Sequence, residues 1–158
     1  MGDLQQIRLL KDPRNLSLFL KVMLGVAVFR VLILRMKLPS LLESLDRSSP
    51  LRRPFEKGDL DRARLAWKYA NFFLLRCLRA KNPCLLRCLT LFRLFRKAGF
   101  DVQIYFGVKK NASLLEGHSW LLLNGDLLLE QGDPQITYTE IYSYPDERNR
   151  FRSTDQNP

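Results

Sequence analysis

The amino-acid sequence predicts an α+β domain in which helices come first and an antiparallel sheet follows. Up to Gly99 apolar residues recur at intervals of three and four, which is the helical period. After Gly99 they alternate with polar residues, which is typical of strands. The chain of 158 residues, 46% hydrophobic and 27% charged, is long enough for one such domain and too short for two of ordinary size.

Two helices are expected in the first half of the chain. The first runs over residues 16–37 and is stopped by Pro39, because the residue before a proline avoids helical geometry. Prolines and polar residues over 38–58 predict a connecting loop, with a short helical turn at 41–45. The second helix begins near Asp59 as its cap, and its apolar stripe ends at Cys77, which is expected to be a small core residue.

A third helix is expected to follow Asn82 and Pro83, since asparagine is a favoured N-cap and proline is favoured just inside a helix. It runs to residue 97 or 98, where Gly99 supplies a left-handed terminus. The residues expected on its buried side are Leu85, Cys88, Leu89, Phe92 and Phe95. Those expected on its solvent side are Arg87, Thr90, Arg93 and Lys97.

Four strands are expected next, as an antiparallel meander. Their predicted ranges are 102–108, 118–123, 127–131 and 136–144, with a polar loop over 109–117. Asn124-Gly125 between the second and third strands is a strong hairpin signal. The charged tail from Pro145 is expected to be loose.

The charge is uneven, because the net charge of +10 divides into +15 over residues 1–110 and −5 over 111–158. A basic first half could bind an acidic peptide, nucleic acid or an anionic membrane. The apolar stretch 16–34 contains Lys21 and Arg30, each of which costs roughly 2.5–3.5 kcal/mol in mid-membrane, so no transmembrane segment is expected. The start of the chain lacks a secretory signal, and three cysteines do not form a disulfide framework, so a cytoplasmic protein is expected.

Cys84 is the one thiol with a physical reason to be reactive. It takes the second position of the third helix, where unpaired backbone N–H groups and the helix dipole favour the thiolate. Cys88 lies one turn further along and is expected to face the core. A nucleophilic thiol needs a base, and the only histidine in the chain is His118.

A third group should orient the imidazole, and the candidates are Asp126, Glu130 and Gln131. A two-residue hairpin loop would place Gln131 on the face of His118, whereas a three-residue loop would place Glu130 there. We expect the three-residue loop and Glu130. The spacing of the cysteines differs from zinc-binding pairs, and phosphate or dinucleotide fingerprints are absent from the sequence, so neither a metal nor a cofactor is expected.

The segment from Asn82 to Glu130 resembles the transglutaminase-like cysteine peptidases of lasso peptide biosynthesis. The residues that carry the resemblance are Cys84-Leu85, Leu89, Leu94, Arg96, Gly99, Gly107-Val108 and His118-Ser119-Trp120. The resemblance implies a transglutaminase-like or papain-like cysteine protease core over 59–144, with 1–58 as an N-terminal helical segment and loop that packs on it, and 145–158 as a tail. It also implies Cys84 as nucleophile, His118 as base and Glu130 where the family usually has aspartate, with Trp120 as a wall beside the imidazole.

The implied function is removal of the leader from a ribosomally made precursor peptide during lasso peptide maturation. The implied partners are that precursor, a separate leader-recognition protein and a lasso cyclase that closes the ring. Two alternatives remain open from the residues. One is a transglutaminase-like acyltransferase outside lasso biosynthesis. The other is a non-enzymatic basic adaptor that binds nucleic acid or a membrane. Nucleic-acid binding is less favoured, because the sequence does not interleave aromatic and basic residues along a strand.

Overall fold

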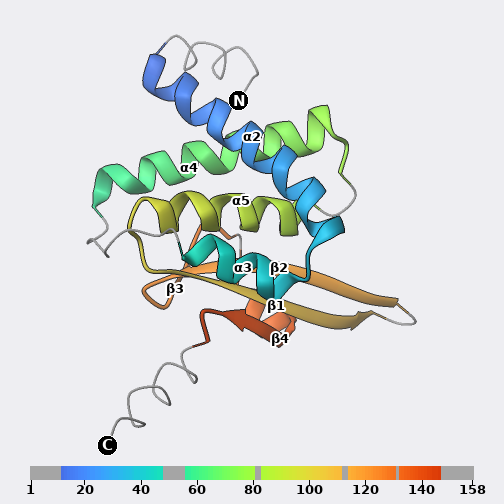
Figure 1. Cartoon of the computed structure of the whole chain (residues 1–158). Helices are drawn as coiled ribbons and strands as arrows, with labels where there is room; N and C mark the ends of the chain where they lie inside the picture. The colour runs from blue at the N-terminus through green and yellow to red at the C-terminus, as the bar shows by residue number, and fades with distance from the viewer. Residues whose placement is uncertain (1–11, 48–55, 81–82, 112–113, 131, 147–158) are drawn as a thin grey trace, which may run out of the picture.

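A computed structural model describes residues 12–47, 56–80, 83–111, 114–130 and 132–146 of the chain. Helices precede a four-stranded antiparallel sheet, as the sequence predicts, and Figure 1 shows the helical layer stacked on the sheet. The helical elements are α2 (Pro13–Arg35), α3 (Leu38–Asp46), α4 (Lys57–Phe72), the π-helix η1 (Phe73–Cys77), α5 (Pro83–Lys97) and α6 (Pro134–Thr137). The strands are β1 (Val102–Asn111), β2 (Leu114–Leu123), β3 (Asp126–Leu127) and β4 (Thr139–Tyr144).

Helix α3 replaces the first part of the loop predicted over 38–58 and includes the short helical turn predicted at 41–45. Pro39 does end the preceding helix, but it also occupies the first turn of α3, where its missing N–H costs nothing. Leu41, Leu42 and Leu45 are buried and attach this short helix to the core. Residues 48–55 of the predicted loop lie outside the described part of the chain.

The start and the end of α4 both differ from the prediction. Glu56 is the N-cap, and Asp59 lies at the third helical position, where the two carboxylates form a reciprocal capping box. At the other end the helix widens into η1, which has more residues per turn. The apolar stripe therefore loses its register after Leu74, and Cys77 is exposed, so the prediction of a core cysteine is wrong.

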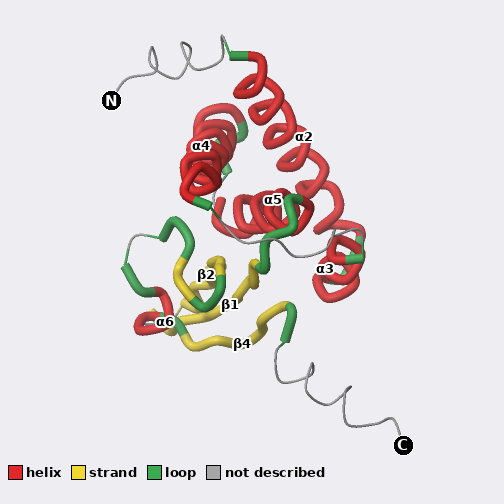
Figure 2. The backbone as a smooth tube through the Cα atoms, turned by 90° about the vertical axis from the view of Figure 1, so that its left-hand side faces the viewer, coloured by secondary structure: helices red, strands yellow, loops and turns green. Residues whose placement is uncertain are grey.

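Helix α5 is the central helix of the fold, and its bounds and the left-handed Gly99 (φ 87°) confirm the prediction. Figure 2 shows it between the other helices and the sheet, so it is covered on both sides. Thr90, predicted to face solvent, is buried because α2 crosses at Gly25, where a Cβ atom would lie 2.9 Å from the Thr90 methyl group. Arg87 is also mostly buried, so the predicted solvent side is wrong at both positions.

The sheet has the strand order β3-β2-β1-β4, which is not the predicted meander, because the fourth strand crosses over to pair with β1. β1 and β2 form a long hairpin that continues through most of the predicted loop 109–117, with residues 112–113 outside the described chain. The predicted third strand is reduced to two residues. Part of the predicted fourth strand is the short helix α6.

The sheet face toward α5 carries the residues that join it to the helical layer. Val102, Ile104 and Phe106 of β1 and Leu121 of β2 belong to one apolar core with α2, α4 and α5. The last residues of the predicted tail, 147–158, lie outside the described chain. The core therefore fixes α5 against β1 and β2, and this interface positions the site described next.

Candidate active site

Cys84 is the second residue of α5 and is half-buried. The first N–H groups of a helix have no partner within it, and they give this end a partial positive charge. A thiolate at this position is favoured by that charge. Asn82, the predicted N-cap, lies outside the described residues.

The first turns of α5 lie against the edge of β2 that β1 does not occupy. Leu121 accepts a hydrogen bond from the backbone of Leu128 on this edge (2.9 Å), so the backbone of Ser119, two residues earlier, also points outward. Cys88 Sγ donates to the Ser119 carbonyl oxygen at 3.1 Å. Cys84 lies one turn earlier on the same helix, and its thiol interacts with the backbone of Ser119.

His118 precedes Ser119, and its imidazole interacts with the Cys84 thiol. Burial alone would raise the pKa of Cys84, but hydrogen bonds to His118 and Ser119, together with the charge of His118, bring that pKa below its usual value of 9.0. The hydrogen bond to Cys84, followed by that to Glu130, raises the pKa of His118 to about 9 against the opposing effect of burial. The arrangement therefore favours a thiolate–imidazolium pair.

Cys88 behaves in the opposite way. It is buried in the core, as predicted, and burial raises the pKa of its thiol to about 12. The thiol pKa values of these two cysteines thus shift in opposite directions, because Cys84 lies at the helix start beside an imidazole and Cys88 lies inside the protein.

Glu130 lies on the other side of the imidazole. Its Oε2 atom is 3.5 Å from His118 Nε2, and its side chain is only 13% exposed. Because Nε2 faces the carboxylate, Nδ1 is the ring nitrogen left for the thiol. The structure thus brings together the three residues predicted as nucleophile, base and orienting group.

The hairpin that precedes Glu130 nevertheless differs from the prediction. Leu123 pairs with Asp126, so the hairpin has a two-residue loop, not the expected three-residue one. Glu130 still reaches His118 because β3 ends at Leu127 and the chain turns at Leu129, whose φ of 62° is left-handed. Asp126 is exposed at the hairpin end, and Gln131 lies outside the described residues.

Arg87 is a functional candidate that the sequence interpretation placed in solvent. Its Nη2 atom is 3.2 Å from Glu130 Oε1, and its side chain is 12% exposed. Nη1 donates to Asn71 Oδ1 at 3.2 Å, and the guanidinium lies 5.5 Å from the centre of the Trp67 ring. Arg87 therefore holds one carboxylate oxygen of Glu130 while the other faces His118. The signal in the sequence was its position three residues after Cys84, on the same side of one helix.

Aromatic rings fix the plane of the imidazole. Trp120 stacks near His118 with ring centres 6.1 Å apart, and Tyr138 stacks with it at 5.1 Å. Trp120 is fully buried, and it lies over Gly107, where a Cβ atom would be 2.8 Å from the indole ring. Trp120 thus lies beside the imidazole as a buried support, and Tyr138 was not identified from the sequence.

Among the described residues, no group of three or more histidine, cysteine, aspartate or glutamate side chains could hold a metal ion. The chemistry available from the described side chains is that of an activated thiolate with an imidazolium acid and an oriented carboxylate.

Comparison with known proteins gives one assignment. A family model described as the transglutaminase-like superfamily matches residues 23–143, which is more than half of the chain and spans every residue of the site. No curated protein and no solved structure matches the chain.

Proposed function

The chain belongs to the transglutaminase-like superfamily, which includes cysteine peptidases and acyltransferases, and we propose that it is a cysteine peptidase of lasso peptide maturation. In this proposal it removes the leader from a ribosomally made precursor peptide. The observation that carries the proposal is the alignment of Cys84, His118 and Glu130 at the start of α5, with a lowered pKa for the thiol and a raised pKa for the imidazole. The finer assignment to lasso precursors comes from the resemblance of residues 82–130.

The proposed reaction passes through a thioester. The Cys84 thiolate attacks the carbonyl carbon at the junction of leader and core, and the oxyanion is held in part by the Cys84 backbone N–H. The His118 imidazolium gives its proton to the departing amine of the core peptide as the C–N bond breaks. Water then attacks the thioester while neutral His118 takes a proton from it, and the leader leaves as a carboxylic acid as the thiolate returns.

Glu130 and Arg87 are positioning residues in this scheme. Glu130 holds the imidazole so that one nitrogen faces the thiol, and it stabilises the imidazolium before the attack. Arg87 keeps the carboxylate oriented through its second oxygen. No cofactor is required for any of these steps.

The proposed partners follow from the reaction. The precursor peptide is the substrate, a separate protein recognises its leader, and a cyclase uses the amino terminus that cleavage frees. We place the reaction in the cytoplasm, where precursor peptides are made.

The test is incubation of the full chain with a leader-bearing precursor and its recognition protein, followed by mass spectrometry. We expect two fragments from the native chain and none from Cys84→Ala. Cys77→Ala is the matched control, because Cys77 is an exposed thiol on η1, and it should cleave normally. Incorporation of an added primary amine without cleavage would instead identify an acyltransferase and overturn the peptidase proposal.

A further inference from the structure

Helix α2 exposes a row of large aliphatic side chains on the side that faces away from the core. We call this set the outer row; its members are Leu16, Leu20, Leu24, Val28, Val31 and Leu34. They are between 42% and 81% exposed, and they follow one another at intervals of three and four over nearly the whole helix. In both overall views α2 lies at the outside of the helical layer (Figures 1 and 2).

The opposite side of α2 is part of the protein core. Val22, Val26 and Phe29 are buried, and they lie about 180° around the helix from the outer row at 100° per residue. Within the described residues α2 is the one helix long and apolar enough to cross a membrane. If α2 crossed a membrane, those three side chains would leave the core. We therefore expect α2 to stay packed in the fold and to contact a membrane only with its outer row.

Basic residues border the outer row on both flanks. Counted from Leu20, Lys21 lies about 100° to one side and Arg30 about 80° to the other. There is no acidic residue from Pro13 to Lys37. Among the described residues neither Lys21 nor Arg30 forms an ion pair, so both charges are available to a partner.

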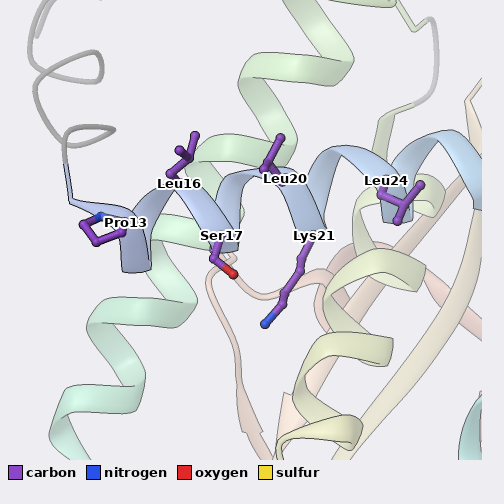
Figure 3. A pocket seen from close by; sticks show the side chains of 6 residues that line it. All are labelled: Pro13, Leu16, Ser17, Leu20, Lys21 and Leu24. Atoms are coloured by element: carbon purple, nitrogen blue, oxygen red, sulfur yellow. The ribbon is translucent and has the colours of Figure 1, made fainter.

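A shallow hollow in the first half of α2 combines the two features. Leucines and the Lys21 side chain line it together with Pro13 and Ser17. Figure 3 shows Leu16 and Leu20 on one side of the helix, and Ser17 and Lys21 on another. Such a surface suits a lipid, because the leucines can contact the acyl chains while the Lys21 ammonium group contacts a phosphate headgroup.

We propose that the outer row binds the surface of an anionic lipid bilayer, with α2 lying in the plane of the interface. We favour lipid as the partner because Lys21 and Arg30 complement the negative charge of an anionic lipid surface. In a symmetric pairing of two copies with antiparallel α2 helices, the Lys21 flank of one copy would face the Lys21 flank of the other, and the Arg30 flanks would likewise face each other. This is unfavourable because α2 has no acidic residue to compensate these charges. The row also contains only leucine and valine, which are under-represented among the residues that dominate specific protein interfaces. This inference goes beyond the proposed peptidase activity and does not depend on it.

The test is flotation of the full chain with vesicles made of equal parts phosphatidylglycerol and phosphatidylcholine, compared with phosphatidylcholine alone. We expect binding to the anionic vesicles that weakens with added salt. Lys21→Gln combined with Arg30→Gln should lower the partition coefficient about 30-fold, since each basic residue near such a surface contributes about a fivefold factor. Leu20→Gln combined with Leu24→Gln should lower it at least about tenfold.

The matched control is Ile136→Gln combined with Ile141→Gln, because these large aliphatic residues are also exposed but lie outside α2. The control should bind as the native chain does, and circular dichroism should show the same helix content in all variants. Equal binding to neutral and anionic vesicles would overturn the proposal, as would full binding by the α2 variants. A dimer that fails to bind vesicles and becomes monomeric with the leucine variant would also overturn it, and would identify a second copy as the partner.

Discussion

Replacing Glu130 by glutamine removes the negative charge that faces His118 and keeps a side chain of the same size. In the native protein the pKa of His118 is raised to about 9, first by the hydrogen bond to Cys84 and then by Glu130. A hydrogen bond to a charged group contributes about 1.5–3 kcal/mol, and one pKa unit corresponds to about 1.4 kcal/mol. At 3.5 Å the Nε2–Oε2 contact is long, so the lower value applies, and the pKa should fall by about one unit.

The direction of the change in activity depends on which protonation state of His118 is the reactive one. The productive pair contains a protonated imidazole, so activity is lost as the pH rises through the pKa of His118. The native chain should therefore lose kcat/KM near pH 9, whereas Glu130→Gln should lose it about one pH unit lower.

Two measurements check this prediction. The chain has only one histidine, so proton or nitrogen NMR of that imidazole gives its pKa directly, without peptide substrate. The pH profile of precursor cleavage gives the kinetic counterpart. Glu140→Gln is the control, because Glu140 is an exposed carboxylate on β4, and β1 separates it from His118. An unchanged imidazole pKa in Glu130→Gln, or a native value near 6.5, would contradict this prediction.

Three further predictions concern other parts of the site. Arg87→Met leaves one oxygen of the buried Glu130 carboxylate without its arginine partner, and we expect kcat to fall about tenfold and the free energy of unfolding in urea to fall by about 2 kcal/mol. At pH 7 iodoacetamide should modify Cys84 faster than the exposed Cys77, as measured by peptide mass spectrometry, because interaction with His118 lowers the pKa of the Cys84 thiol. Gly107→Ala places a Cβ 2.8 Å from the indole of Trp120, so it should destabilise the fold by about 1–3 kcal/mol in thermal or urea unfolding and reduce kcat by displacing the ring beside the imidazole.

Each of these three predictions has a matched control elsewhere in the chain. Arg64→Met removes an exposed arginine from a pair on α4 and should change neither kcat nor stability by a measurable amount. Cys88 should resist alkylation in the folded protein. Gly58→Ala meets no atom within 4 Å and should stabilise α4 by about 1 kcal/mol. Full activity in Arg87→Met or Gly107→Ala, or alkylation of Cys77 before Cys84, would contradict the corresponding prediction.

Helix α5 was predictable because its signals are local. The proline at the start of α5, Gly99 at its end and the apolar period along it are all contained in one short segment. The position of Cys84 in the first turn followed from the same signals. The π-helical widening at Phe73 has no such local signature, and it moved Cys77 out of the core.

Contacts between distant segments were not predictable in the same way. The pairing of β4 with β1 and the crossing of α2 at Gly25 depend on tertiary packing, so neither the strand order nor the burial of Thr90 could be inferred from periodicity. The position of Glu130 illustrates the limit well. The alternating pattern predicts a third strand that continues to residue 131, whereas the chain leaves the strand after Leu127 and a turn brings the carboxylate back to the imidazole.

Cys84 and Arg87 belong to one helix, whereas His118 belongs to a strand. A rigid displacement of α5 would carry the sulfur and the guanidinium together and leave the imidazole behind. The distance between the Cys84 sulfur and the His118 ring nitrogen therefore depends on one interface. In this interface α5 packs against the outer edge of β2, and Cys88 donates a hydrogen bond to the Ser119 carbonyl. A change of side-chain volume between α5 and β2 should consequently alter the distance between the sulfur and the imidazole, whereas a change on the outer surface of the helical layer should not.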